Sequence, residues 1–205
     1  MKIAIFGATR GIGKEVVQQA LAQGHEVLVL ARNQADIAVQ NERLSVRQGN
    51  VLDQTAVEQT LANVAAVICT LGKTSDNPDD LVSRGMANII SAMQETGVQR
   101  LIVVTSIGVG DSKSQAPLFF RLLMWTVLRK VMQEKERQEE LVRQSGLQWT
   151  IVRPGGLTDG PQTGHYKHGL ARSIKAGRIS RADVAEFLLR QLAEKTYVRM
   201  AASVS

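Results

Sequence analysis

A glycine-rich turn between two regular patterns, within the first thirteen residues, limits the fold of this chain more than any other feature. The apolar run at residues 2–6, with β-branched Ile3 and Ile5, is typical of a buried strand. An amphipathic helical pattern begins near Gly11. Strand, glycine turn and helix in this order predict a dinucleotide-binding fingerprint, because the free N–H groups of the helix face a pyrophosphate.

The glycines of the turn have distinct expected roles. Gly7 allows a tight exit from the strand, Gly11 allows the backbone to approach a phosphate, and Gly13 lets the helix pack closely. The alternative is an ordinary glycine turn without a ligand. The position of this turn between a clear strand and a clear helix favours dinucleotide binding. The turn residues expected to contact the cofactor are Gly7, Thr9, Arg10, Gly11, Ile12 and Gly13.

Length and composition suit one α/β domain spanning residues 1–205, with 44% hydrophobic and 21% charged residues. No apolar run approaches the roughly 18 residues of a membrane span. The lone Cys69 excludes an internal disulfide and favours a core role in a reducing compartment, so we expect a cytoplasmic protein without a metal site. The net charge of +6 is dispersed, which favours small anionic ligands over nucleic acid.

Apolar runs alternate with helical patterns along the rest of the chain. The further strands are predicted at 26–31, 44–49, 65–71, 100–105, 147–152 and about 196–202. The further helices are predicted near 54–62, 80–96, 117–144 and 180–194. This alternation predicts a single doubly wound α/β domain with a parallel sheet, a Rossmann fold, whose strand ends face the ligand crevice. Thr70, Leu71 and Gly72 end one strand and are expected beside the ribose and pyrophosphate.

Two arginines indicate which dinucleotide is bound. An NAD-specific site usually has an acidic residue at the end of the second strand, but here Arg32 follows that strand and the nearest carboxylate is Asp36. Arg10 lies in the glycine turn. Two guanidinium groups suit the 2′-phosphate of NADPH. The alternative is that either arginine is simply solvated and contacts no ligand.

The chain lacks the usual catalytic tyrosine of many reductases. Neither Tyr166 nor Tyr197 is followed by Lys at the fourth position. Phe119–Trp125 is rich in apolar bulk, which predicts core or a subunit interface more than the wall of a flat substrate pocket.

The motifs together resemble the atypical short-chain dehydrogenase/reductases of the NAD(P)-binding, NmrA-like branch. They are the Gly-x-x-x-Gly-x-Gly turn, Lys135 with Glu139, Ser145-Gly146-Leu147 and the Thr-Ile-Val-Arg-Pro-Gly-Gly run at 150–156. Within this branch the chain is similar to the flavin reductase/biliverdin-IXβ reductase family, which also shares the run at 161–166. It departs from that family at Arg10, where the family has glycine one position earlier in its turn, and at Gly156, where the family has His.

The resemblance implies roles for further residues. Asn50 and Val51 match the positions that hold adenine, and Ser106 matches a serine near the nicotinamide. Lys135 matches a lysine that binds the nicotinamide ribose, with a solvated helix lysine as the alternative, so Ser106 and Lys135 are the candidate catalytic residues. The other residues expected near the nicotinamide are Thr105, Pro154, Gly155, Gly156 and Leu157, the two glycines permitting close approach or positive φ.

These features predict hydride transfer from NADPH to a flat conjugated acceptor, either a flavin such as FMN or a linear tetrapyrrole of the biliverdin type. Solvent or a hydroxyl group would supply the proton, and Ser106 would orient the acceptor. One alternative is an NADPH-sensing or assembly protein of the NmrA-like type. Another is an epimerase or isomerase, which would require a carboxylate or tyrosine near the nicotinamide. We expect a monomer or a weak homodimer.

Overall fold

The computed structural model describes residues 1–74, 77–115, 128–170 and 174–205. Its main sheet contains β1 (Lys2–Phe6), β2 (Glu26–Ala31), β3 (Leu44–Gln48), β4 (Ala66–Cys69), β5 (Arg100–Val104), β6 (Gln148–Pro154), β8 (His168–Leu170) and β10 (Met200–Val204). The strand order is β3-β2-β1-β4-β5-β6-β10-β8, and every neighbouring pair is parallel except β10 with β8. This order confirms the expected doubly wound parallel sheet.

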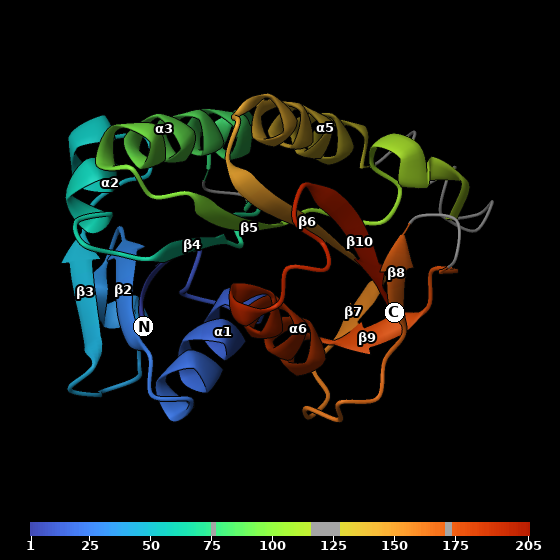
Figure 1. Ribbon diagram of the computed structural model, residues 1–205, viewed down its shortest axis with the longest axis horizontal. Helices are drawn as coiled ribbons and strands as arrows, with labels where there is room; N and C mark the ends of the chain where they lie inside the picture. The colour runs from blue at the N-terminus through green and yellow to red at the C-terminus, as the bar shows by residue number, and fades with distance from the viewer. Residues whose placement is uncertain (75–76, 116–127, 171–173) are drawn as a thin grey trace.

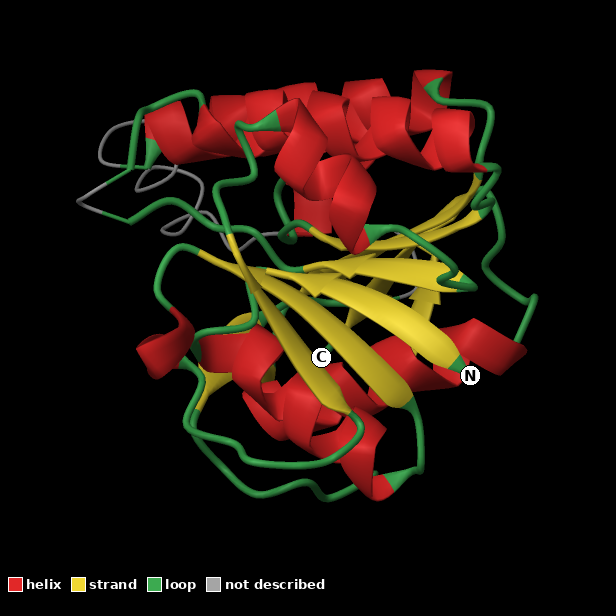
Figure 2. Cartoon of the chain, turned by 90° about the vertical axis from the view of Figure 1, so that its left-hand side faces the viewer, coloured by secondary structure: helices red, strands yellow, loops and turns green. Residues whose placement is uncertain are grey.

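Helices cover both faces of the sheet, as Figures 1 and 2 show. They are α1 (Gly11–Ala22), α2 (Gln54–Thr60), α3 (Leu81–Thr96), α5 (Arg129–Gln144) and α6 (Arg181–Ala193), with short 3-10 helices η1 (Gln34–Asp36) and η2 (Gly110–Gln115). One layer is formed by α1 and α6, and α2, α3 and α5 form the other (Figure 1). Among the described residues, no helix is long and apolar enough to cross a membrane.

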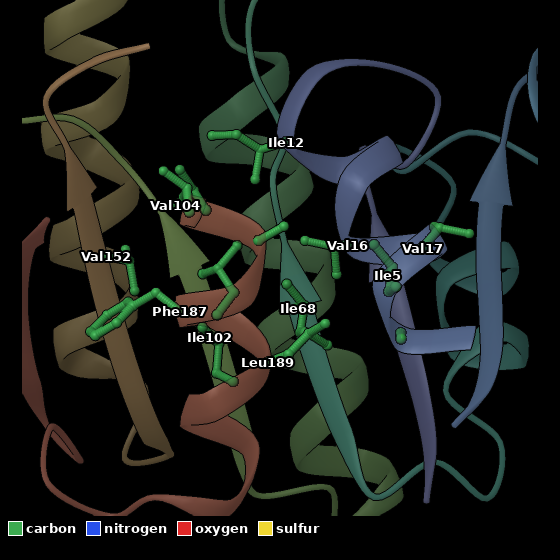
Figure 3. Close-up of a cluster of buried hydrophobic side chains, with 14 of the residues drawn as sticks. Ile5, Ile12, Val16, Val17, Ile68, Ile102, Val104, Val152, Phe187 and Leu189 are labelled. Atoms are coloured by element: carbon green, nitrogen blue, oxygen red, sulfur yellow. The ribbon is translucent and has the colours of Figure 1, made fainter. Parts of the chain in front are cut away.

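The central strands bury both of their faces, which is why they read as continuous apolar runs in the sequence. Ile3 and Ile5 of β1 pack toward α1 and α6, while Ala4 and Phe6 pack toward the opposite helix layer. Figure 3 shows the first of these clusters, where Phe187 of α6 lies among residues of the sheet. The period-2 alternation therefore builds one core on each face of the sheet.

The C-terminal third differs most from the sequence prediction. The last strand begins at Met200 rather than at 196, because residues 197–199 form a turn in which the Met200 N–H donates to the Tyr197 carbonyl at 3.1 Å. The prediction also missed β8 and the separate parallel pair β7 (Gly156–Thr158) with β9 (Arg178–Ser180). Phe119–Trp125 lies outside the described residues.

Candidate cofactor site

The glycine turn after β1 is held against the end of β4. Gly7 has a φ of 86°, and a Cβ atom there would lie 2.8 Å from the carbonyl carbon of Thr70. The Thr70 hydroxyl donates to the carbonyl oxygens of Phe6 and Gly7 at 3.1 and 3.0 Å. A Cβ atom on Gly13 would lie 2.1 Å from the Gly7 carbonyl oxygen, so α1 packs directly on the turn. Both glycines are therefore required for their close contacts.

The N-terminus of α1 is open to an anion. Arg10 occupies the N-cap position in an extended conformation and makes no side-chain cap, and the first turn has no acidic residue. The first backbone N–H groups of a helix have no partner within the helix and carry a partial positive charge. Gly11, which is exposed at this end, adds no side chain over them. This arrangement fits the phosphate groups of a dinucleotide.

A crevice of about 410 Å³ runs from this turn along the carboxyl ends of β1, β2 and β4. Its lining contains many of the residues expected from the sequence: Gly7, Thr9, Arg10, Gly11, Ile12, Arg32, Asn50, Val51, Thr70, Leu71, Gly72 and Leu157. The remaining lining residues are Ala8, Leu30, Ala31, Gly49, Lys73, Thr74, Asn77, Leu81 and Arg181.

The charged residues in the described lining of the crevice are all cationic. Its described lining includes Arg10, Arg32, Lys73 and Arg181 and no aspartate or glutamate. Lys73 pairs with Asp79, and Arg181 pairs with an aspartate at 2.6 Å. Within the described parts of the chain, neither Arg10 nor Arg32 has a carboxylate at ion-pair distance. The two arginines are therefore available to an anionic ligand.

The turn after β3, which also lines the crevice, is held by hydrogen bonds to its neighbours. The Asn50 side-chain oxygen accepts the Leu52 N–H at 3.0 Å, and the Val51 carbonyl accepts the Asn88 amide at 3.0 Å. A Cβ atom on Gly85 of α3 would lie 2.9 Å from Val51, so α3 approaches this turn closely. Two hydrogen bonds and close packing therefore define the position of the residues expected to hold adenine.

Residues expected beside the nicotinamide gather at the carboxyl ends of β5 and β6. The Thr105 N–H donates to Val152 at 2.9 Å, and the Ile107 N–H donates to Pro154 at 3.1 Å. Ser106 is half-buried between them, and its hydroxyl donates to the Ile107 carbonyl at 3.0 Å. Thr105, Ser106 and Pro154 lie together in this way but are not part of the crevice lining.

Lys135 of α5 is buried with its ammonium group between two strand ends. Its Nζ donates to the carbonyls of Leu71 and Val104 at 2.7 and 3.0 Å and to the Gln138 side chain at 3.0 Å. Burial lowers the pKa of Lys135 to about 8. Cys69 beside it is fully buried, and burial raises the pKa of this thiol to about 11, in keeping with a core residue. Lys135 thus joins β4 to β5 next to the crevice.

Glu139 and Arg153, from the motifs that carry the family resemblance, form a buried ion pair. Arg153 donates to Glu139 through Nε at 2.8 Å and Nη2 at 2.5 Å, and to Asp111 through Nη1 at 2.6 Å. Burial alone would lower the pKa of Arg153, but these carboxylates outweigh it and raise the pKa. The Thr105 hydroxyl donates to Glu139 at 2.8 Å. The Glu139–Arg153 pair therefore holds α5 against the sheet. The Thr105 hydroxyl bonds to this pair through Glu139.

Gly155 and Gly156 serve close packing of backbone on backbone. A Cβ atom on Gly155 would lie 2.4 Å from the Gly177 carbonyl oxygen, and the Gly156 N–H donates to that same oxygen at 2.8 Å. Neither glycine has a positive φ. Of the two alternatives from the sequence, close approach is the one observed, and the group approached is Gly177.

Both tyrosines of the chain lie away from the crevice. Tyr166 donates its hydroxyl to Glu186, and the Tyr197 hydroxyl lies 2.9 Å from Nδ1 of His168. Both rings pack 6.0 Å from the ring of Phe187, centroid to centroid. No tyrosine or histidine is among the described lining residues of the crevice. The missing tyrosine of the sequence is therefore not replaced by one from elsewhere in this lining.

The glycine turn, the open helix end and the positive crevice define a dinucleotide-binding Rossmann protein. A family model described as NAD(P)H-binding matches residues 7–195, and the chain belongs to this family. It is an oxidoreductase-like family with an NAD(P)-binding core.

Three similar proteins illustrate the range of relatives. An uncharacterized chloroplastic protein of Arabidopsis thaliana is 29% identical over 95% of this chain and 72% of its own length. The photosystem II assembly factor Ycf39 of Synechocystis is 26% identical over 96% of this chain, which spans 61% of that relative. ChuY, an anaerobilin reductase from Escherichia coli O157:H7, superposes with a TM-score of 0.84 at 26% identity, covering 100% of this chain and 96% of that one.

Proposed function

We propose that this protein is an NADPH-dependent reductase, formed by one domain, which transfers hydride to a flat conjugated acceptor such as a flavin or a linear tetrapyrrole. The observation that carries the proposal is a crevice beside a phosphate-binding glycine turn, lined in its described part by four cationic side chains and no carboxylate. Such a lining favours a cofactor with an additional phosphate group. We place it in a reducing compartment such as the cytoplasm, as a monomer or weak homodimer.

Arg10 and Arg32 support NADPH over NADH. Both are exposed, both line the crevice, and no carboxylate of the described chain neutralises them. The end of β2, where an acidic residue would accept the ribose hydroxyls of NADH, has Arg32 instead. Guanidinium groups bind phosphate through paired charge-assisted hydrogen bonds. We therefore assign the 2′-phosphate to these two arginines.

The remaining residues position the reactants. When bound, the reduced nicotinamide supplies the hydride. Lys135 keeps the crevice wall in place through the Leu71 carbonyl, and Ser106 orients the acceptor. Leu157 is 38% exposed and offers an apolar surface at the crevice for a flat ring. Holding the acceptor in place is the main contribution of the protein, since the described lining offers no tyrosine or histidine acid. Solvent supplies the proton.

Similarity to ChuY supports a tetrapyrrole-like acceptor over other conjugated molecules. That protein is described as an anaerobilin reductase and matches this chain along its full length at 26% identity. The dispersed positive charge of this chain would attract the propionates of a bilin or the phosphate of FMN.

Replacing Arg32 tests the cofactor assignment. Arg32→Ala is expected to weaken NADPH binding by roughly tenfold or more, because a charge-assisted contact to the 2′-phosphate is lost, and to leave NADH binding unchanged. Both dissociation constants are measured by fluorescence titration. Arg47→Ala is the control, since Arg47 is an exposed arginine on the neighbouring strand that bonds to Gln59 and does not line the crevice. An unaltered preference for NADPH in Arg32→Ala would refute the assignment.

A second function, NADPH sensing in an assembly role, is supported by a different observation. The relative Ycf39 is an assembly factor and matches 96% of this chain. In this reading the occupied crevice changes the affinity for a protein partner, and no acceptor is reduced. Tight NADPH binding without turnover of any acceptor would favour it.

A further inference from the structure

Arg181, the first residue of α6, lies over the glycine turn although 170 positions separate it from Gly11 in the sequence. It lines the crevice, and a Cβ atom on Gly11 would lie 3.6 Å from Nε of Arg181 and 3.8 Å from its Cδ. The guanidinium group is thus adjacent to the open N-terminus of α1. The C-terminal half of the chain thereby supplies a cation to a site that the sequence places in the first thirteen residues.

Three contacts anchor the backbone on the two sides of Arg181. Ser180 caps α6, with its hydroxyl accepting the Asp183 N–H at 2.9 Å. The Gln19 side chain of α1 donates to the Ala182 carbonyl at 2.9 Å, which joins α1 to α6. Ser180 also pairs with Thr158 in the β7–β9 ladder. Because these contacts lie on both sides of Arg181, its position over α1 is determined by the fold and not by a mobile loop.

The side chain of Arg181 is held loosely by comparison. Its Nη1 donates to Asp159 at 2.6 Å, and Asp159 is the one hydrogen-bond partner of this guanidinium within the described chain. The side chain of Asp159 is 91% exposed and that of Arg181 is 29% exposed. An exposed ion pair contributes little stability, and an arginine carries five N–H donors. The group therefore retains donors for a ligand in the crevice.

We propose that Arg181 binds the pyrophosphate of the dinucleotide beside the glycine turn, and that Asp159 competes with the pyrophosphate for its guanidinium group. The α1 N–H groups and Arg181 then contact the phosphates from two elements, while Arg10 and Arg32 serve the 2′-phosphate. The inference rests on the proposed occupation of the crevice by NADPH and not on the proposed acceptor.

The test compares binding of NADPH and NADH, which share the pyrophosphate and differ in the 2′-phosphate. Arg181→Gln is expected to weaken both by a similar factor of roughly tenfold, whereas Asp159→Asn tightens both about twofold to threefold by releasing the guanidinium. The matched control is Arg178→Gln, which removes the same charge from the exposed start of β9 outside the crevice and leaves both affinities unchanged. Titration calorimetry gives the dissociation constants without any acceptor.

Arg181→Gln with normal affinity for both dinucleotides would overturn the inference. A loss of affinity confined to NADPH would also overturn it, because it would assign Arg181 to the 2′-phosphate. An equal loss in Arg178→Gln would overturn it as well, because it would show that removing any positive charge from this region weakens binding. Arg181→Lys keeps the charge and is expected to lose less affinity than Arg181→Gln, which covers the case that the glutamine variant folds poorly. A wild-type protein that binds NADPH and reduces no acceptor would defeat the reductase proposal and leave this one standing.

Discussion

Lys135 shows how a single buried side chain can shape the site without lining it. Its ammonium group donates to the carbonyls of Leu71 and Val104 and to Gln138, so contact with a ribose would require it to leave one of them. The sequence motif identified Lys135 as important, but spacing along a helix cannot reveal which carbonyls its tip reaches. The same holds for Thr105, whose hydroxyl bonds to Glu139.

Burial of Lys135 predicts a pH-dependent stability. Its pKa falls from 10.5 to about 8 on folding, so the folded state binds fewer protons than the unfolded state between these values. Stability from this group is therefore lowest below pH 8 and rises as the pH approaches 10.5. Relative to Lys135→Met, the wild-type free energy of unfolding should rise by about 2–3 kcal/mol across that window. Urea unfolding at several pH values measures it, and identical pH profiles would contradict the assignment.

At the scale of elements, long buried segments were predictable and short ones were not. The strands β1, β2, β4 and β5 are mainly apolar runs, which the sequence reveals because both of their faces are covered, whereas the edge strand β3 shows an alternating pattern. By contrast β7, β8 and β9 have three residues each, too few to show a period of two. The β7–β9 pair brings Gly155 against Gly177, a contact between segments whose glycines look like ordinary loop residues.

The contact between α1 and the glycine turn predicts a sharp effect of one methyl group. Gly13→Ala places a Cβ atom 2.1 Å from the Gly7 carbonyl oxygen, so α1 must shift. We expect a loss of about 1–3 kcal/mol in the free energy of unfolding, together with weaker dinucleotide binding. Gly72→Ala serves as the stability control, because a Cβ atom there meets nothing within 4 Å. Equal urea midpoints for Gly13→Ala and the wild type would show that the packing is looser than described.

At the scale of the whole molecule, the crevice combines a local signal with a distant one. The glycine turn and the ends of β2, β3 and β4 were predictable because each follows directly from its own strand. Arg181 reaches the same crevice through the β7–β9 pair and the packing of α6 on α1, which no local pattern encodes. The sequence therefore indicated the glycine turn and the strand ends of the crevice better than the part of its lining that comes from α6.

In the proposed function, this crevice supports hydride transfer from NADPH to a flat acceptor. The most direct measurement follows the absorbance of the reduced nicotinamide with FMN, riboflavin and biliverdin as acceptors, using NADPH and NADH in parallel. We expect oxidation that depends on an acceptor and is faster with NADPH than with NADH at equal subsaturating concentrations. Tight NADPH binding with no oxidation by any of the three acceptors would contradict the reductase function and favour the sensing role.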